Sequence, residues 1–454
     1  MFFDRIVSEG IAHNSYIIGS AGMAAVIDPR RDCDVYFDSA AKQDLTITHI
    51  FETHRNEDYV IGSIEMKERC NAPVFHGSRM AFSYGNPVRE GDLFSLGSLE
   101  LSILETPGHT EESISIVVRD KEISDQPYLV FTGDTLFAGD IARTDFFGRQ
   151  RDEEMAVKIY DSITNKILSL GDGVIICPAH GAGSVCGEEI ADLPFTTAGY
   201  EKRTNPSLLA GREKFIANRI SESPYMPPYF RQMEWYNKEG APVLHRIPDL
   251  KPLSIPEVNE IRKLACQILD IRSPTSFGAG HIPGSISIWR EGIPAFIGWF
   301  FDYQVPIMIV DDFNLELGSV IRRMVRLGYD NTAGYLAGGF PAWFKGAQEI
   351  GTIPTCSVQQ LNHCLLENSP FLLDVRDRKN WQSVGHIPGA HHRYVGELPD
   401  HLDEIPKVEP VFVYCDAGYK GSLAASILAR DGYTNVTNVL GGMTAWKRAG
   451  YPVN

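Results

Sequence analysis

The sequence lacks paired cysteines, long apolar runs and an excess of basic residues. Its eight cysteines are scattered with no Cys-x-x-Cys pair, which favours reduced thiols and a cytoplasmic location over a disulfide framework. No run reaches the roughly 18 apolar residues that a membrane-spanning helix needs. The first residues show no basic segment followed by an apolar one, so we expect neither a membrane anchor nor a secretory signal.

Basic residues are also outnumbered by acidic ones. Lys and Arg total 42 against 58 Asp and Glu, which gives a formal charge of −16. Nucleic acids and anionic membrane surfaces both attract basic patches, so neither is expected as a partner. Hydrophobic residues make up 43% and charged residues 22%, as in ordinary globular proteins. The length of 454 residues suits about three domains.

Two stretches in the second half of the chain repeat each other. Residues 269–288 contain Leu-Asp-Ile-Arg followed by Gly-His-Ile-Pro-Gly, and residues 373–391 contain Leu-Asp-Val-Arg followed by Gly-His-Ile-Pro-Gly. A Gly-Gly-x-x-Ala-Trp segment follows in each copy, at 338–343 and 441–446. The copies lie about 104 residues apart, which is too long for a solenoid repeat and indicates two tandem domains of one fold. A proline-rich connector precedes the first copy, so we divide the chain into residues 1–240, 250–351 and 352–454.

Four short apolar runs in the first domain each lead into His or Asp. The runs are 47–51, 101–104, 128–131 and 174–176, and the polar residues that follow them are His54, His109, Asp134 and His180. Each run is typical of a buried strand. Loops at strand ends commonly carry function, so four strand ends at one edge can bring these side chains to one site.

These segments resemble the metallo-β-lactamase superfold, which implies an αββα fold for residues 1–240. The first motif of that family is Thr-His-x-His-x-Asp-His, and residues 53–59 read Thr-His-Arg-Asn-Glu-Asp-Tyr. Asn56 and Tyr59 replace two imidazoles, so we do not expect a dinuclear zinc site. His54, His109 and Asp134 remain as metal ligands. Two imidazoles and one carboxylate are typical of non-haem Fe(II) oxygenases and leave three positions open, whereas tetrahedral zinc would leave one.

Within the superfold, this set is similar to that of the persulfide dioxygenases. Residues 139–146, 180–187 and 199–205 resemble the branch of that family that is fused to rhodanese domains. The resemblance implies one Fe(II) per chain, with Zn²⁺ as the alternative. Asp58 and His180 are expected to orient ligands or hold a substrate water. Cys186 is expected either near the site, in contact with substrate, or as a buried inert thiol.

Four basic or aromatic residues are further candidates for substrate binding. Arg143 can clamp a substrate carboxylate or pair with a structural Asp. Tyr200, Lys202 and Arg203 form either an anion-binding handle for a thiol cofactor or a solvated basic patch.

The third domain contains a candidate thiol nucleophile. The apolar run 410–414 leads into Cys415 and a short loop with Gly418, which opens a helix predicted over 423–431. Backbone N–H groups of such a loop and the helix dipole stabilise an anion, so we expect a lowered pKa for Cys415, with a further contribution from Lys420. Such a thiolate can accept a sulfur atom and hold it as a persulfide.

The loop resembles the rhodanese signature Cys-x-x-Gly-x-Arg-Ser, with Lys420 at the Arg position. The Gly-His-Ile-Pro-Gly and Gly-Gly-x-x-Ala-Trp segments are the flanking motifs of that family. The resemblance implies two α/β rhodanese-like domains with parallel central sheets. In the middle copy, Asp311 replaces Cys415 and Glu316 replaces Lys420, so this copy is expected to be inactive and to act as a spacer or docking surface.

Together these resemblances imply a persulfide dioxygenase fused to a sulfurtransferase. Glutathione persulfide or a similar small persulfide would be oxidised by O₂ to sulfite and thiol. Cys415 would then pass sulfane sulfur to sulfite and yield thiosulfate, which would detoxify sulfide. A homo-oligomer is expected. Two alternatives stay open: a zinc thioester hydrolase of the glyoxalase II kind with a rhodanese appendage, and a persulfide relay or sensor with a structural metal.

Overall fold

A computed structural model describes residues 1–187 and 189–454. These residues pack as two compact units, Met1–Ile247 with Arg322–Gly328, and Pro248–Ile321 with Tyr329–Asn454. The first unit contains two six-stranded sheets and the second contains two five-stranded sheets. No helix among the described residues is both long and apolar enough to cross a lipid bilayer.

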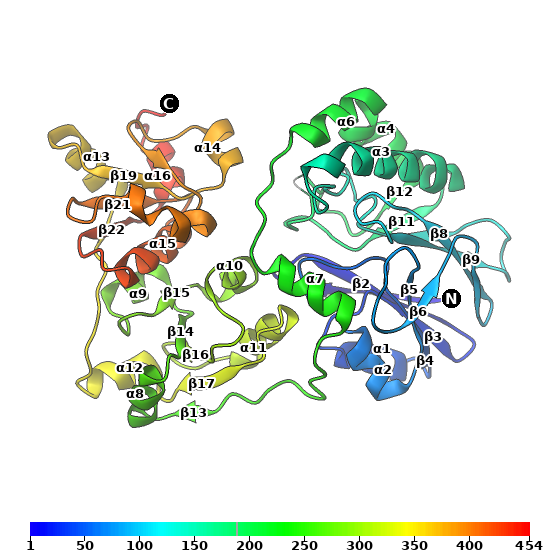
Figure 1. Cartoon of the computed structure of the whole chain (residues 1–454), viewed down its shortest axis with the longest axis horizontal. Helices are drawn as coiled ribbons and strands as arrows, with labels where there is room; N and C mark the ends of the chain where they lie inside the picture. Colours follow the sequence, from blue (N-terminus) through cyan, green and yellow to red (C-terminus); the bar gives the residue numbers. More distant parts are fainter. Residues whose placement is uncertain (188) are drawn as a thin grey trace. The chain divides into compact units, whose positions relative to one another are not determined.

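The first sheet has its six strands in sequence order. β1, β2 and β3 pair antiparallel, and β3 to β6 pair parallel. The strands are β1 (Phe2–Ser8), β2 (His13–Ser20), β3 (Met23–Ile27), β4 (Thr46–Phe51), β5 (Val74–Gly77) and β6 (Asn86–Val88). The helices α1 (Asp34–Ala41) and α2 (Ser63–Cys70) pack on its outer face (Figure 1).

The second sheet has the strand order β12-β11-β10-β9-β8-β7. Its strands are β7 (Leu93–Leu96), β8 (Leu99–Glu105), β9 (Ile114–Asp120), β10 (Leu129–Gly133), β11 (Ile175–Pro178) and β12 (Thr196–Thr197). The remaining helices of this domain are α3 (Asp152–Ser162), α4 (Ala198–Thr204), α5 (Pro206–Leu209), α6 (Arg212–Ser221) and α7 (Phe230–Glu239).

Three apolar clusters hold these layers together. Phe51 of the first sheet packs with Ile103 and Phe131 of the second sheet in the central core. A second cluster lies between the first sheet and α1 and α2, and a third joins the second sheet to α3 through Ala156 and Ile159. Strands β9 and β10 are buried almost throughout, because one face meets the other sheet and the other face meets helices. The predicted αββα architecture is confirmed.

The strand directions explain why the candidate ligands meet. β8 and β10 both run antiparallel to β9, and β10 runs parallel to β11. The carboxyl ends of β8, β10 and β11 therefore lie at the same edge of the second sheet. His109, Asp134 and His180 follow these three ends, and His54 follows β4 of the facing sheet.

The second unit contains two sheets of matching topology, in which every neighbouring pair of strands is parallel. The middle sheet has the order β13-β17-β16-β14-β15, with β13 (Pro252–Leu253), β14 (Gln267–Asp270), β15 (Ile286–Ser287), β16 (Ile307–Val310) and β17 (Thr332–Leu336). The last sheet has the order β18-β22-β21-β19-β20, with β18 (Thr355–Cys356), β19 (Phe371–Asp374), β20 (His391–His392), β21 (Val411–Tyr414) and β22 (Val436–Val439). The predicted pair of α/β domains with parallel sheets is confirmed.

Nine helices named here accompany these two sheets. The middle domain has α8 (Ile255–Lys263), α9 (Pro274–Ala279), α10 (Ile293–Phe300), α11 (Leu317–Arg326) and α12 (Gly339–Lys345). The last domain has α13 (Val358–Glu367), α14 (Arg378–Val384), α15 (Tyr419–Arg430) and α16 (Gly442–Arg448). α8 and α13 begin with capping boxes, in which side chains satisfy backbone N–H groups of the first turn.

Candidate metal centre and cysteine loop

His54, His109 and Asp134 come together in a buried cluster. The Oδ2 atom of Asp134 lies 3.8 Å from Nε2 of His54 and 3.6 Å from Nε2 of His109. Each residue is at most 2% exposed. Burial raises the pKa of Asp134, but the imidazoles of His180 and His54 outweigh it and hold the pKa well below its ordinary value. Burial lowers the pKa of His54 to about 4, so this imidazole is neutral at neutral pH and can act as a ligand.

Each of these imidazoles is oriented through its Nδ1 atom. Nδ1 of His54 lies 2.9 Å from Oγ1 of Thr53, which itself donates to Asp28 at 2.7 Å and must therefore accept from His54. Nδ1 of His109 lies 2.9 Å from the carbonyl oxygen of Arg143, which can only accept. In both residues the proton is therefore on Nδ1. The lone pair of Nε2 is then available to bind a metal, as is usual for histidine ligands.

A glycine allows the two sheets to approach at this point. Gly133, at the end of β10, has φ +54°, and a Cβ atom there would lie 2.4 Å from Oγ1 of Thr53 and 3.3 Å from Nδ1 of His54. Any side chain at position 133 would therefore displace the group that orients His54.

The atoms that face the centre of the cluster fit a metal ion. Nε2 of His109, Oδ2 of Asp134 and Oε2 of Glu57 are buried and have no hydrogen-bond partner. Unpartnered buried polar atoms are rare in folded proteins because they lose their hydrogen bonds to water. Lone pairs of two imidazoles and a carboxylate that converge in this way suit Fe(II) or Zn²⁺.

Glu57 is a candidate ligand that the sequence analysis missed. Its Oε2 lies 3.5 Å from Nε2 of His109, and one donor atom each of His54, Glu57 and His109 lie within 4.8 Å of one another. Its Oε1 accepts from Arg55 at 3.0 Å, which leaves Oε2 for the cluster. The sequence did contain a signal for this ligand, because Glu57 is a carboxylate inside the metal-binding motif. The family pattern specifies no residue at that position of the motif.

Asp58, His180 and Cys186 lie directly beside the first cluster. Nδ1 of His180 is 2.7 Å from Oδ1 of Asp134, and its Nε2 is 3.0 Å from Oδ2 of Asp58. His180 therefore orients Asp134, one of the roles expected for it. One donor atom of Cys186 lies within 4.8 Å of donor atoms of both His109 and Asp134. Cys186 is therefore buried beside the metal cluster, and a position near the site is one of the two placements expected for it.

The structure places Arg143 in the structural role. Its guanidinium donates to both carboxylate oxygens of Asp145 at 2.7 Å and to the carbonyl of Tyr225 at 3.1 Å. This pairing with Asp145 is one of the two roles expected for Arg143, and the substrate clamp stays a prediction. Arg143 acts on the site through its backbone carbonyl, which orients His109.

The surroundings of Tyr200, Lys202 and Arg203 fit the second of their two expected roles, a solvated basic patch, and the anion handle stays a prediction. Lys202 and Arg203 lie on α4 and pair with Asp172 at 2.6 and 3.4 Å. Asp172 precedes β11, whereas His180 follows it, so these residues lie at the opposite edge of the sheet from the metal centre. Tyr200 is 49% exposed on the same helix. These residues form a solvated surface patch.

Cys415 lies at the end of β21, in the loop that opens α15. Its Sγ accepts from the backbone N–H of Gly418 at 3.1 Å, and Gly418 has φ +102° as the residue that caps the helix. α15 therefore begins at Tyr419, one turn before the predicted start. Nζ of Lys420 lies 3.1 Å from Asp416 and 3.6 Å from Asp377, so its charge is shared with two carboxylates.

The predicted lowering of the Cys415 pKa is wrong. Cys415 is 1% exposed, and burial raises the pKa of its thiol above the ordinary value. The backbone N–H groups of Gly421, Ala417 and Gly418 and the charge of Lys420 act in the lowering direction without reversing the shift. The free thiol is therefore mostly protonated at neutral pH.

This protonation state predicts a steep pH dependence. The thiolate is the reacting form, and below the pKa its fraction rises about tenfold per pH unit. We expect the rate of Cys415 alkylation by iodoacetamide, followed by peptide mass spectrometry, to rise about tenfold per pH unit between about pH 6 and 8. A plateau within that range would show a lowered pKa instead. The same peptide from Cys415→Ser supplies the blank.

The middle domain shows what replaces the thiol. The backbone N–H of Phe340 donates to the carbonyl of Asp311 at 2.8 Å, as that of Met443 donates to the carbonyl of Cys415 at 2.8 Å. Asp311 thus occupies the position of Cys415. Its Oδ2 accepts from the backbone N–H of Asn314 at 2.7 Å and from Arg290 at 2.9 Å. A fixed carboxylate fills the anion-binding loop, so this copy offers no sulfur acceptor there.

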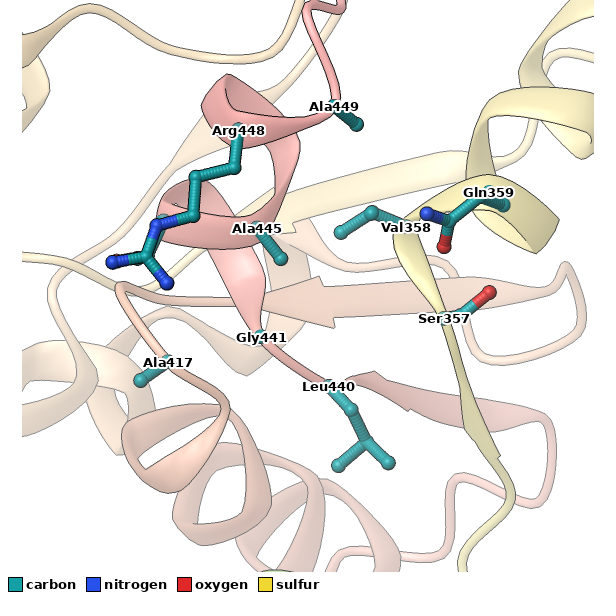
Figure 2. Close-up of a pocket in the computed structure, with 10 residues that line it drawn as sticks. Ser357, Val358, Gln359, Ala417, Leu440, Gly441, Ala445, Arg448 and Ala449 are labelled. Carbon is teal, nitrogen blue, oxygen red and sulfur yellow. The ribbon is translucent and has the colours of Figure 1, made fainter.

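Figure 2 shows a surface pocket that touches the cysteine loop only at its margin. Ala417 lines it together with Leu440, Gly441, Ser357 and Arg448. Cys415 is not among the residues that line this pocket. The pocket therefore lies beside the thiol and does not expose it.

Comparisons with known proteins match separate parts of the chain to two families. Residues 9–180 match the family described as Metallo-beta-lactamase superfamily, and residues 257–345 and 357–449 match the Rhodanese-like domain. A crystal structure of a metallo-beta-lactamase from Staphylococcus aureus subsp. aureus COL is 31% identical in sequence and has a TM-score of 0.66. The matched region spans 74% of this chain and 98% of that chain.

Two further relatives match the first domain. Hydroxyacylglutathione hydrolase GloC of Haemophilus influenzae is 28% identical over 207 residues, which are 41% of this chain and 87% of that protein. The crystal structure of ETHE1 from Myxococcus xanthus is 30% identical in sequence and has a TM-score of 0.46. The matched region spans 52% of this chain and 98% of that chain. The metallo-hydrolase and rhodanese families indicate an enzyme. The chain belongs to the metallo-beta-lactamase superfamily, with two rhodanese-like domains after the metallo-beta-lactamase domain.

Proposed function

We propose that this protein oxidises a small persulfide with O₂ at its buried metal centre and transfers a second sulfane sulfur through Cys415. The observation that carries the first part is the donor set. Nε2 of His109, Oδ2 of Asp134 and Oε2 of Glu57 are buried without a hydrogen-bond partner, and Nε2 of His54 lies 3.8 Å from Oδ2 of Asp134. An octahedral ion held by all four would keep two positions open, enough for a sulfur and O₂. A tetrahedral zinc held by all four would keep none.

The proposed reactions balance as two steps. A persulfide RSSH, O₂ and water give sulfite, the thiol RSH and two protons. A second RSSH then passes its outer sulfur to the thiolate of Cys415 and leaves as RSH, and sulfite takes that sulfur to give thiosulfate. Glutathione persulfide is the proposed carrier. Fe(II), when bound by these residues, would supply a redox-active centre for the oxidation of the persulfide sulfur by O₂.

The protein's own residues prepare this chemistry. His54, Glu57 and His109 would hold the metal together with Asp134, and Thr53 and the Arg143 carbonyl keep the imidazoles in place. The near-complete burial of the cluster excludes bulk water from the reacting atoms. In the last domain, covalent transfer through Cys415 divides sulfur transfer into two easier displacements.

The test is O₂ consumption by the full chain. Protein loaded anaerobically with Fe(II) should consume one O₂ per sulfite formed when glutathione persulfide is added, and thiosulfate should follow. The zinc-loaded protein should consume none. Absence of O₂ uptake with iron shown to be bound would overturn the dioxygenase and leave a persulfide relay.

Thioester hydrolysis is a second candidate, because GloC, a relative, is named a hydroxyacylglutathione hydrolase. It predicts that the zinc-loaded chain cleaves S-lactoylglutathione faster than the iron-loaded chain oxidises persulfide. Asn56 and Tyr59, where the family motif has imidazoles, argue for the oxygenase.

A further inference from the structure

Asn438 is a buried side chain that contacts the cysteine loop and is not used by the reactions proposed above. It lies in β22, the strand that pairs with β21, and is 1% exposed. Its Nδ2 donates to the backbone carbonyl of Gly418 at 3.0 Å. Gly418 is also the residue whose N–H donates to Sγ of Cys415 at 3.1 Å. One residue of the loop therefore meets the thiol through its N–H and the amide of Asn438 through its carbonyl.

The carbonyl of Gly418 also begins α15. It accepts from the backbone N–H of Ser422 at 3.1 Å, as the first carbonyl of the helix. Gly418 has φ +102°, a conformation that glycine adopts without strain, but the missing side chain also leaves its backbone freer to rotate than that of any other residue. The bond from Asn438 therefore restrains a flexible peptide at the point where the loop becomes helix.

Gly421 provides the space that the amide of Asn438 occupies. A Cβ atom at position 421 would lie 2.3 Å from Oδ1 of Asn438, and the nearest atom outside Asn438 would be the carbonyl oxygen of Val413 at 3.5 Å. Oδ1 itself is buried without a hydrogen-bond partner. Buried acceptors of this kind are rare, since they lose their hydrogen bonds to water. Here the unpaired Oδ1 is the consequence of turning Nδ2 toward Gly418.

The middle copy makes the same connection with the asparagine on the other side. Asn314 stands in the loop at the position of Gly418, and its N–H makes the equivalent bond to the residue that replaces the thiol. Its Nδ2 donates to the carbonyl of Leu336 in β17 at 2.9 Å. Tyr335 stands at the position of Asn438, since the two strands pair in the same register. An asparagine amide therefore joins loop to strand in both copies, but the copy with the thiol carries it on the strand and keeps a glycine in the loop.

We propose that Asn438 is a positioning residue for Cys415 and that position 421 is glycine to make room for it. By fixing the Gly418 carbonyl, Asn438 keeps the N–H of Gly418 on Sγ while sulfur enters and leaves. This inference rests on the proposed sulfur transfer through Cys415. Sulfite attacks the outer sulfur of the Cys415 persulfide anion, the S–S bond breaks, and its electron pair returns to Sγ as a thiolate. An N–H that is already in place stabilises this charge without having to reorient.

The test is the sulfur-transfer half-reaction of the full chain without O₂. Protein is treated anaerobically with glutathione persulfide, the excess reagent is removed, and sulfite is added. Persulfide on the Cys415 peptide is counted by mass spectrometry, and the rate of thiosulfate formation is expressed per persulfidated Cys415. Asn438→Ala should lower this rate by about tenfold to 100-fold, because small displacements of groups at the reacting atoms cost this much.

Gly421→Ala tests the same contact with the amide still present. Its methyl group displaces the side chain of Asn438, so we expect a similar fall in the rate. In Asn438→Ala/Gly421→Ala the methyl group meets only the carbonyl of Val413 at an ordinary distance, so the rate should stay within about twofold of that of Asn438→Ala. Independent effects would instead multiply. A purely structural role would lower the melting temperature of the variants and leave the rate per persulfidated Cys415 unchanged.

Asn314→Gly is the matched control, because it removes the equivalent amide from the copy without a thiol, and glycine suits its φ of +57°. Its rate should equal that of the wild type. A wild-type rate in Asn438→Ala or in Gly421→Ala would overturn the positioning role. Multiplication of the two effects in the double variant would overturn the pairing of Gly421 with Asn438. Absence of persulfide on Cys415 in the wild type is a separate result, which would overturn the proposed sulfur transfer itself.

Discussion

Asp134→Asn should lower both iron binding and persulfide-dependent O₂ uptake by about 100-fold or more. Oδ2 of Asp134 lies within 3.8 Å of Nε2 of both His54 and His109, so its charge serves the whole donor set. Loss of groups that merely orient ligands costs 10–100-fold, and loss of a ligand charge should cost at least as much. Iron per chain from elemental analysis and the initial rate at an oxygen electrode measure the two effects.

The matched control is Asp172→Asn. Asp172 is a surface carboxylate that pairs with Lys202 at the opposite edge of the sheet, so iron content and O₂ uptake should stay at the wild-type level. Because Asn keeps the shape of the Asp134 side chain, the variant should fold, and circular dichroism verifies this. Full iron content in Asp134→Asn would remove Asp134 from the metal site.

Cys415→Ser should abolish thiosulfate formation while O₂ uptake stays within about twofold of the wild type. A serine hydroxyl cannot hold sulfane sulfur, so we expect a fall of about 1,000-fold in the transfer of sulfur to sulfite. Sulfite should accumulate in place of thiosulfate. Quantifying both anions after a fixed O₂ consumption measures the split between the two reactions.

Cys364→Ser is the control for this substitution. Cys364 is a half-buried thiol on α13 of the same domain, away from the loop that opens α15. Its replacement should leave both products unchanged. Thiosulfate formed by Cys415→Ser at the wild-type rate would mean that sulfite reacts with persulfide without the rhodanese-like domain.

The strand-end residues could be predicted because they follow from local pattern. Apolar runs of three to five residues mark the strands, and strand direction then brings His54, His109, Asp134 and His180 to one edge. The repeat likewise showed that Asp311 takes the place of Cys415. The two copies share one fold, so residues at matching sequence positions occupy equivalent places in the two domains. The backbone hydrogen bonds of both copies confirm that equivalence.

The predictions that the structure contradicts or leaves open concern the partners and the burial of a side chain. Arg143 and Lys202 carry the charge expected of anion-binding residues, but Asp145 and Asp172 occupy them. Cys415 sits in the expected loop with the expected N–H donor, yet complete burial raises its pKa. Partners and burial depend on packing between segments that are far apart in the chain, and local pattern carries little information about either.

The sequence by itself determined the tandem repeat, the replacement of Cys415 by Asp311 in the middle copy and the residues at the strand ends, because these depend on hydrophobic period and spacing. The resemblances to known families implied the fold classes. Only the tertiary structure decided that Glu57 turns toward His109, that Cys186 lies between Asp58, His180 and the first cluster, and that three imidazoles are tethered through Nδ1. Those features arise where loops from both sheets meet in a space closed to water, and there geometry and charge depend on all the loops together.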